Sequence, residues 1–169
     1  MAVLQIIAWP DPVLGKVTSP VVAISDVADL AHDMLDTMYA APGRGLAAPQ
    51  VGILLRLFVM DTTWKDGVRD PLVCVNPEVI AQSDEMATNA EGCLSIKGVS
   101  LDVTRPAWVE LSWTDLQGIR NQRRFDGFAA ACVQHEYDHL EGRLTFDLVT
   151  PTARASAEAT YHAYQETHL

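Results

Sequence analysis

Basic residues are scarce in this 169-residue sequence, which contains 12 Lys and Arg against 22 Asp and Glu. The net charge of −10 disfavours binding to phosphate backbones and to anionic lipid surfaces. Long apolar runs are also missing: the longest one, residues 51–60, is interrupted by Arg56 and has about half the length that a bilayer requires. We therefore expect neither a membrane nor a nucleic acid as a direct partner.

Cysteine is limited to Cys74, Cys93 and Cys132, an odd number and too few for a disulfide framework. The first twelve residues contain no basic stretch followed by an apolar run, so they do not resemble a secretory signal. Together these features predict a cytoplasmic protein whose thiols are available as core residues, nucleophiles or metal ligands. Repeats and linker-like segments are missing as well, and the length suits a single domain over residues 1–169.

Hydrophobic periodicity predicts three helices. Apolar residues recur at helical spacing over residues 25–39, with Ser25 as a suitable N-cap. The same period returns over residues 128–141, where Gly142 marks the C-terminal end. A last helix is expected over residues 150–169, starting at Thr150 or Thr152.

Between the first two helices the sequence is rich in β-formers. The predicted strands cover residues 55–61, 72–76, 79–82, 86–90, 108–113 and 120–125. Short strands joined by turns, such as the one at Gln117–Gly118, favour antiparallel pairing. The sequence therefore predicts an α+β domain with antiparallel strands around the helix at residues 128–141.

That helix carries the motif H-E-x-x-H over residues 135–139. His135 and His139, four residues apart, project from one face of a helix and can bind the same metal ion. Glu136 would lie beside this ion, where it could accept and return a proton. The pattern arises by chance in roughly one sequence in a hundred of this length, so metal binding is the favoured interpretation.

A catalytic metal site usually has three protein ligands, so a third one is needed. Thr145 occupies the position at which a metzincin protease would have its third histidine. Cys132 is about 10 Å from His139 along the helix axis, too far to share one ion. Glu158 would give a thermolysin-like protease, and Cys93 is the other candidate.

Three segments resemble the motifs of the peptide deformylase family. Residues 43–50 (GRGLAAPQ), 91–95 (EGCLS) and 134–140 (QHEYDHL) fit the family patterns G-x-G-L-A-A-x-Q, E-G-C-L-S and Q-H-E-x-D-H-L in the same order. The resemblance extends from about Leu4 to Asp147. It implies a peptide deformylase-like fold in one catalytic domain that removes the formyl group from formyl-methionyl peptides, with N-formylated nascent peptides as partners.

The resemblance also implies a ligand set and a reaction. Cys93, His135 and His139 would hold one divalent metal ion, Fe(II) in the cell, with Zn, Ni or Co possible in purified protein. A metal-bound hydroxide would attack the formyl carbon, with Glu136 as general base and then as general acid.

Further roles follow from the same resemblance. The oxyanion would be held by the Gln50 side chain and the Leu94 backbone N–H. Glu91 is expected to form a structural ion pair with Arg105. The substrate pocket would be lined by Gly43, Arg44, Gly45, Asn89, Phe128 and Cys132.

Two pocket residues depart from the family pattern. Arg44 and Asn89 stand where family members commonly have aliphatic residues beside the methionine pocket. This leaves open an alternative, a divergent paralogue with a different N-terminal residue preference or weak turnover. The C-terminal segment, residues 150–169, contains one Arg and two Glu, so the basic helix by which some deformylases dock on the ribosome is not expected here.

Overall fold

The computed structural model describes residues 2–168 and shows an α+β fold. Within these residues the three α-helices are α1 (Ala28–Ala40), α2 (Gly127–Leu140) and α3 (Pro151–Thr167). The strands are β1 (Gly45–Ala47), β2 (Leu57–Met60), β3 (Leu72–Gln82), β4 (Met86–Cys93), β5 (Ile96–Pro106), β6 (Trp108–Thr114) and β7 (Arg120–Asp126). All neighbouring strands within the sheets pair antiparallel, as the sequence predicts. In this part of the chain no helix combines the length and apolarity needed to cross a membrane.

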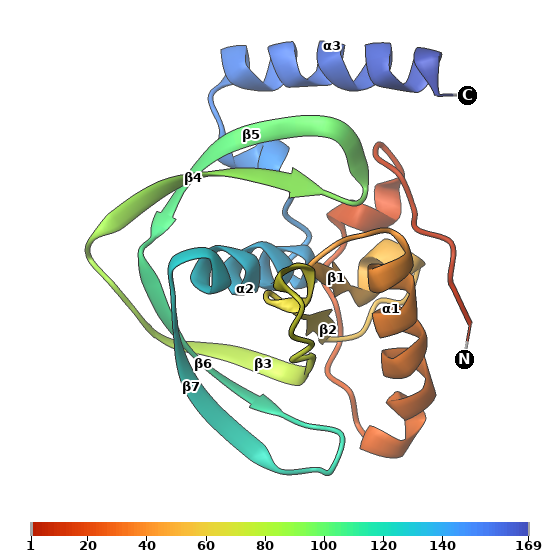
Figure 1. Cartoon of the computed structure of the whole chain (residues 1–169), viewed down its shortest axis with the longest axis vertical. Helices are drawn as coiled ribbons and strands as arrows, with labels where there is room; N and C mark the ends of the chain where they lie inside the picture. The colour runs from red at the N-terminus through yellow and green to blue at the C-terminus, as the bar shows by residue number, and fades with distance from the viewer. Residues whose placement is uncertain (1, 169) are drawn as a thin grey trace.

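The strands form two separate sheets that enclose α2 (Figure 1). Five strands follow the order β1-β2-β3-β6-β7, and the hairpin β4–β5 forms the second sheet. Figure 1 shows α2 between this hairpin and strands β3, β6 and β7, with α1 beside β1 and β2. Helix α3 packs on β5. The motif-bearing helix is therefore the centre of the molecule, which explains why it carries so few exposed apolar residues.

Strand β2 is buried along its whole length because two helices cover its opposite faces. Phe58 and Met60 join a core cluster that also contains Val133 of α2. Leu57 and Val59 point the other way, into a cluster that includes Met34 of α1. Side chains alternate along a strand, so a continuous apolar run fits a strand buried on both faces.

Of the two predicted helix N-caps, the one at Thr150 is present in the structure and the one at Ser25 is not. Thr150 caps α3 by accepting a hydrogen bond from the Ala153 N–H (3.2 Å), as expected for a helix that begins at Pro151. The expected cap at Ser25 is wrong, because Ser25 lies in a 3-10 turn (Ile24–Asp26) and α1 starts three residues later without a side-chain cap.

The strand predictions missed the short strand β1 and the longer strand β5. In β5 the buried residues Leu101, Val103 and Arg105 alternate with exposed polar ones, and a buried arginine hides the apolar period. The two strands expected at residues 72–76 and 79–82 are one strand, β3. Its register shifts between Val75 and Glu78, and this irregularity accommodates the proline that suggested a break.

Candidate active site

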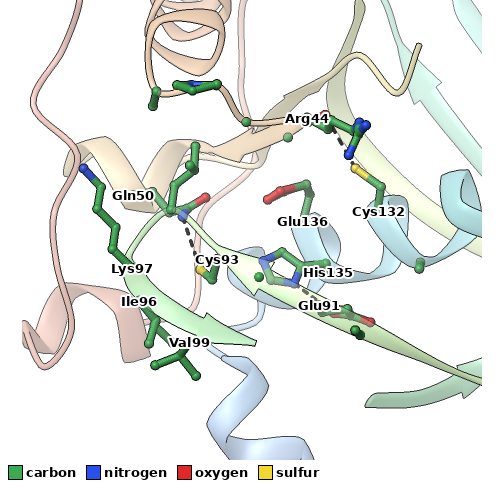
Figure 2. A pocket seen from close by; sticks show the side chains of 18 of the residues that line it. Arg44, Gln50, Glu91, Cys93, Ile96, Lys97, Val99, Cys132, His135 and Glu136 are labelled. Atoms are coloured by element: carbon green, nitrogen blue, oxygen red, sulfur yellow. Dashed lines mark hydrogen bonds and ion pairs between the residues drawn. The ribbon is translucent and has the colours of Figure 1, made fainter. Parts of the chain in front are cut away.

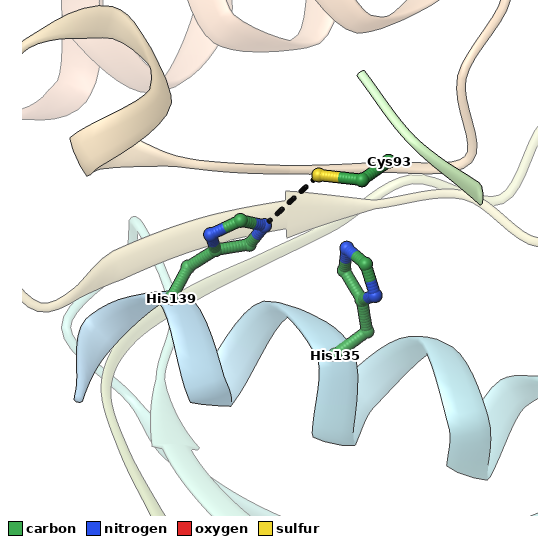
Figure 3. A group of neighbouring side chains, drawn as sticks. All are labelled: Cys93, His135 and His139. Atoms are coloured by element: carbon green, nitrogen blue, oxygen red, sulfur yellow. Dashed lines mark hydrogen bonds between the residues drawn. The ribbon is translucent and has the colours of Figure 1, made fainter. Parts of the chain in front are cut away.

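Helix α2 and the end of β4 bring three potential metal ligands together. His135 and His139 project from successive turns of α2 toward Cys93, which ends β4 (Figure 3). One donor atom from each residue lies within 4.8 Å of the other two, and Cys93 Sγ is 3.6 Å from His139 Nε2. We call these three residues the ligand group. A thiolate and two imidazoles in this arrangement could hold a divalent metal ion.

Buried charges hold the ligand group in place. His135 Nδ1 lies 3.0 Å from Glu91 Oε1, which leaves the Nε2 of the ring for a metal. Arg105 donates to both oxygens of Glu91 (2.7 and 2.9 Å) and to Asp138 of α2 (2.7 Å). Burial alone would raise the pKa of Glu91, but the bonds from Arg105 and His135 outweigh it and keep the pKa below its usual range. Glu91 is therefore an anion that orients His135.

Glu136 is buried and lies in tight contact with Gly45 of β1. A Cβ added at Gly45 would lie 2.7 Å from Glu136 Oε2, so the side chain can occupy this position only beside a glycine. Burial raises the pKa of Glu136 to about 7. A carboxyl group with this pKa can both accept and release a proton near neutral pH.

The orientation of the Gln50 amide is set by three neighbours. Its Oε1 accepts from the Ala47 N–H (3.0 Å), so the amide nitrogen must face the other way. Nε2 donates to Ser95 Oγ (3.0 Å). It also lies 3.6 Å from Cys93 Sγ, the contact marked by a dashed line in Figure 2. Leu94, next to Cys93, packs its side chain against Gly43. The hydrogen bonds of Gln50 therefore direct its amide nitrogen, a donor, at the ligand group.

These groups open into a cavity of about 620 Å³. Its lining includes Gly43, Arg44, Gly45, Gln50, Asn89, Glu91, Cys93, Leu94, Phe128, Cys132, His135 and Glu136. The Arg44 guanidinium carbon lies 5.1 Å from the centre of the Phe128 ring, and its Nε is buried without a hydrogen-bond partner. Cys132 donates to the Arg44 carbonyl (3.6 Å), and burial raises the pKa of its thiol well above the usual range. The structure places every expected pocket residue around one space.

Three supporting residues were not singled out from the sequence. Ser95 and Asp138 both lie inside the motif segments, where the need to fix Gln50 and Arg105 could have suggested them. Trp64 lies outside the motif segments, yet its indole N–H donates to the Gly43 carbonyl (2.9 Å) at the cavity wall. No spacing in the sequence indicates this long-range contact.

The alternative third ligand, Glu158, is not part of the ligand group. Its carboxylate accepts a hydrogen bond from Arg154 Nε (2.8 Å) one turn away on α3. The structure therefore does not favour the ligand set of a thermolysin-like protease.

Several known proteins are similar to this chain in sequence and in fold. The family model for polypeptide deformylase matches residues 3–155. The chain is 46% identical over 156 residues to a peptide deformylase of Parasynechococcus marenigrum, an alignment that covers 92% of this chain and 75% of that protein. The crystal structure of a peptide deformylase from Legionella pneumophila superimposes with a TM-score of 0.93 at 35% identity, covering 99% and 98% of the two chains.

A peptide deformylase from Synechococcus elongatus, solved in complex with actinonin, superimposes with a TM-score of 0.89 at 39% identity and covers 96% of this chain and 88% of that one. The sequence match, the shared topology and the fit of the ligand group to a metalloenzyme all agree. The chain belongs to the peptide deformylase family, whose members are hydrolases that remove N-terminal formyl groups from nascent peptides.

Proposed function

We propose that this protein hydrolyses the formyl amide of N-formylmethionyl peptides at the cavity in front of the ligand group. The observation that carries the proposal is the convergence of Cys93, His135 and His139 with the buried carboxyl group of Glu136 and the fixed amide of Gln50. This set contains a metal-ligand group, a proton carrier and an oxyanion donor in one cavity.

The donor set fits a divalent metal ion, Fe(II) in the cell and Zn, Ni or Co in purified protein. Cys93 would bind through its thiolate, His139 through Nε2 and His135 through the nitrogen that does not face Glu91. When bound, the ion supplies a Lewis acid that polarises the formyl group and acidifies water. Burial lowers the pKa of His139 well below the usual value, which favours the neutral ring that a metal ligand needs.

Glu136 would move the proton. Its carboxylate takes a proton from the attacking water, whose oxygen bonds to the formyl carbon. The same carboxyl group then gives the proton to the amide nitrogen as the C–N bond breaks, which releases formate and a free amine. The pKa of about 7 suits both directions of transfer, because neither protonation state is strongly favoured at neutral pH.

Gln50 and Leu94 would stabilise the negative charge that develops on the formyl oxygen. Gln50 Nε2 is already aimed at the ligand group by the bonds from Ala47 and to Ser95, so little reorganisation is needed during the reaction. The Leu94 backbone N–H follows directly after the Cys93 ligand. Pre-oriented donors of this kind are typically worth about 3 kcal/mol each.

Formate release tests the proposal directly. Protein loaded anaerobically with Fe(II) or Ni(II) is mixed with formyl-Met-Ala-Ser and, as a matched control, with acetyl-Met-Ala-Ser. We expect formate from the first peptide and no hydrolysis of the second, because the cavity must accept water beside the small formyl group. Metal-loaded protein that releases no formate would overturn the proposal.

The expected setting is the cytoplasm, where formylated nascent peptides are made. Helix α3 contains a single arginine, Arg154, which is half-buried and engaged by Asp147 and Glu158. We therefore propose that the protein meets its substrate without a basic C-terminal helix docked on the ribosome. Co-sedimentation with ribosomes at low and moderate salt tests this part.

A further inference from the structure

The cavity is rich in cations although the chain is strongly acidic. Of the 12 basic residues in the chain, Arg44, Lys65 and Lys97 line this one space. Its acidic side chains are Glu91 and Glu136, and both are buried. Glu91 is neutralised by Arg105, so it contributes little negative field at the entrance. We call Arg44, Lys65 and Lys97 the cationic rim.

The cationic rim is not neutralised by the protein. In residues 2–168 the arginines that pair with carboxylates are Arg56, Arg105, Arg120, Arg124, Arg143 and Arg154. No ion pair within this range involves a residue of the rim. Three unpaired cations beside one cavity of a protein with net charge −10 retain their full attraction for an anionic ligand.

Arg44 lines the cavity next to the reacting groups. It directly precedes Gly45, the position at which an added Cβ would collide with Glu136. Its guanidinium lies over the ring of Phe128, which is 53% exposed. Arg44 itself is half-buried, and its Nε is buried without a hydrogen-bond partner, so the cation is available to a ligand in the cavity.

The two lysines lie on other walls of the same cavity. Figure 2 shows Lys97 and Arg44 on opposite sides of Cys93 and Gln50. Lys65 is exposed, and its ammonium group lies 5.7 Å from the ring of Trp64, the residue bonded to the Gly43 carbonyl. A bound peptide that extends from the ligand group along the cavity therefore lies between positive charges.

We propose that the cationic rim selects formylmethionyl peptides that carry acidic side chains at their second and third residues. The proposal rests on the deformylase function and specifies its substrate class. Exposed ion pairs are individually weak, so each contact should change kcat/KM by about two- to five-fold, and the effect should decrease as salt screens the charges.

The test compares formyl-Met-Glu-Ser, formyl-Met-Gln-Ser and formyl-Met-Lys-Ser, together with a second series that varies the third residue. At low salt we expect kcat/KM to fall in the order Glu, Gln, Lys, and the differences to shrink at about 0.5 M NaCl. Equal values for the three peptides in both series, or a difference that does not respond to salt, would overturn the proposal.

Matched variants assign the effect to the rim. Arg44→Met should reduce the preference for Glu over Gln, whereas Arg123→Met should not. Like Arg44, Arg123 lies over a phenylalanine ring, 4.5 Å from the centre of Phe125, but it is exposed and lies on β7 outside the cavity lining. Lys97→Gln is paired in the same way with Lys16→Gln. Equal effects within a pair would show that general charge, and not the rim, causes the preference.

A binding measurement separates this inference from the function on which it rests. Fluorescently labelled Met-Glu-Ser and Met-Gln-Ser, which lack the formyl group, are titrated with the metal-loaded protein. If no peptide is turned over but the Glu peptide binds more tightly and Arg44→Met removes the difference, the deformylase function fails and the rim stands. If turnover is normal and neither assay distinguishes Glu from Gln, only the rim proposal fails.

Discussion

Charged side chains are paired behind the ligand group but lack carboxylate partners, within residues 2–168, in the cationic rim. Behind the ligand group, Glu91, Arg105 and Asp138 are buried and joined by bonds of 2.7 to 2.9 Å, so each charge has a partner. We call these three residues the buried charge network. In the cationic rim, Arg44, Lys65 and Lys97 have no carboxylate partner within residues 2–168. Paired buried charges fix geometry, whereas charges without a partner beside a cavity attract ligands. The buried charge network therefore orients the groups that react, whereas the cationic rim acts in substrate selection.

The largest effect should come from the ligand group. Cys93→Ala removes the thiolate, so we expect most of the bound metal and nearly all activity to be lost. Cys132→Ala is the matched control, because Cys132 lines the same cavity but is not in the ligand group. Metal content by elemental analysis distinguishes the two. Full occupancy in Cys93→Ala would refute its role as a ligand.

Removing a cation from the buried charge network should destabilise the protein far more than removing one from the surface. Arg105→Met leaves Glu91 and Asp138 as buried carboxylates without their main partner, which should lower the free energy of unfolding by about 3–5 kcal/mol. Arg143→Met removes a second, half-exposed partner of Asp138 and should cost less than about 1 kcal/mol. Urea unfolding measures both. Similar decreases in the free energy of unfolding in the two variants would contradict the contrast between the buried charge network and the surface.

The oriented amide should matter for turnover more than for substrate binding. Gln50→Leu removes the donor at the developing oxyanion, so kcat should fall by about 10²- to 10³-fold with little change in KM. Ser95→Ala frees the same amide without removing it and should have a smaller effect in the same direction. An increase in KM at unchanged kcat for Gln50→Leu would assign it to substrate binding instead.

The smallest effect is expected at the cavity wall. Trp64→Phe keeps an aromatic ring against Tyr39 but removes the bond to the Gly43 carbonyl, so KM should rise a few-fold while kcat stays near its original value. Trp108→Phe, on β6, is the control. If both variants have the same KM as the unmodified protein, the bond does not position the wall.

The parts of the site that could be predicted from the sequence are those set by local spacing. A helix brings residues four apart onto one face, so His135 and His139 follow from the sequence of α2 alone. The link from Cys93 to these histidines required the family resemblance, because it depends on how β4 packs over α2. Strand β5 was missed since the buried Arg105 looks polar in the sequence and is satisfied only by distant carboxylates.

Contacts between distant segments set the remaining details. The bond from Trp64 to Gly43 and the position of Arg44 over Phe128 depend on the arrangement of whole elements. The Ser25 cap failed for a related reason, because packing of Val27 into the α1 core decides where that helix begins. Local propensity was overruled by burial in this case.

The central claim is that Glu136 transfers the proton during formyl hydrolysis at the ligand group. Formate release by Glu136→Gln, compared with Glu141→Gln at equal metal content, tests it most directly, since Glu141 follows α2 and pairs with Arg56 away from the ligand group. We predict that Glu136→Gln retains its metal and loses about 10³-fold or more in kcat, while Glu141→Gln remains within a few-fold of the unmodified protein. Loss of the metal in Glu136→Gln, or activity within ten-fold of the original, would contradict the account.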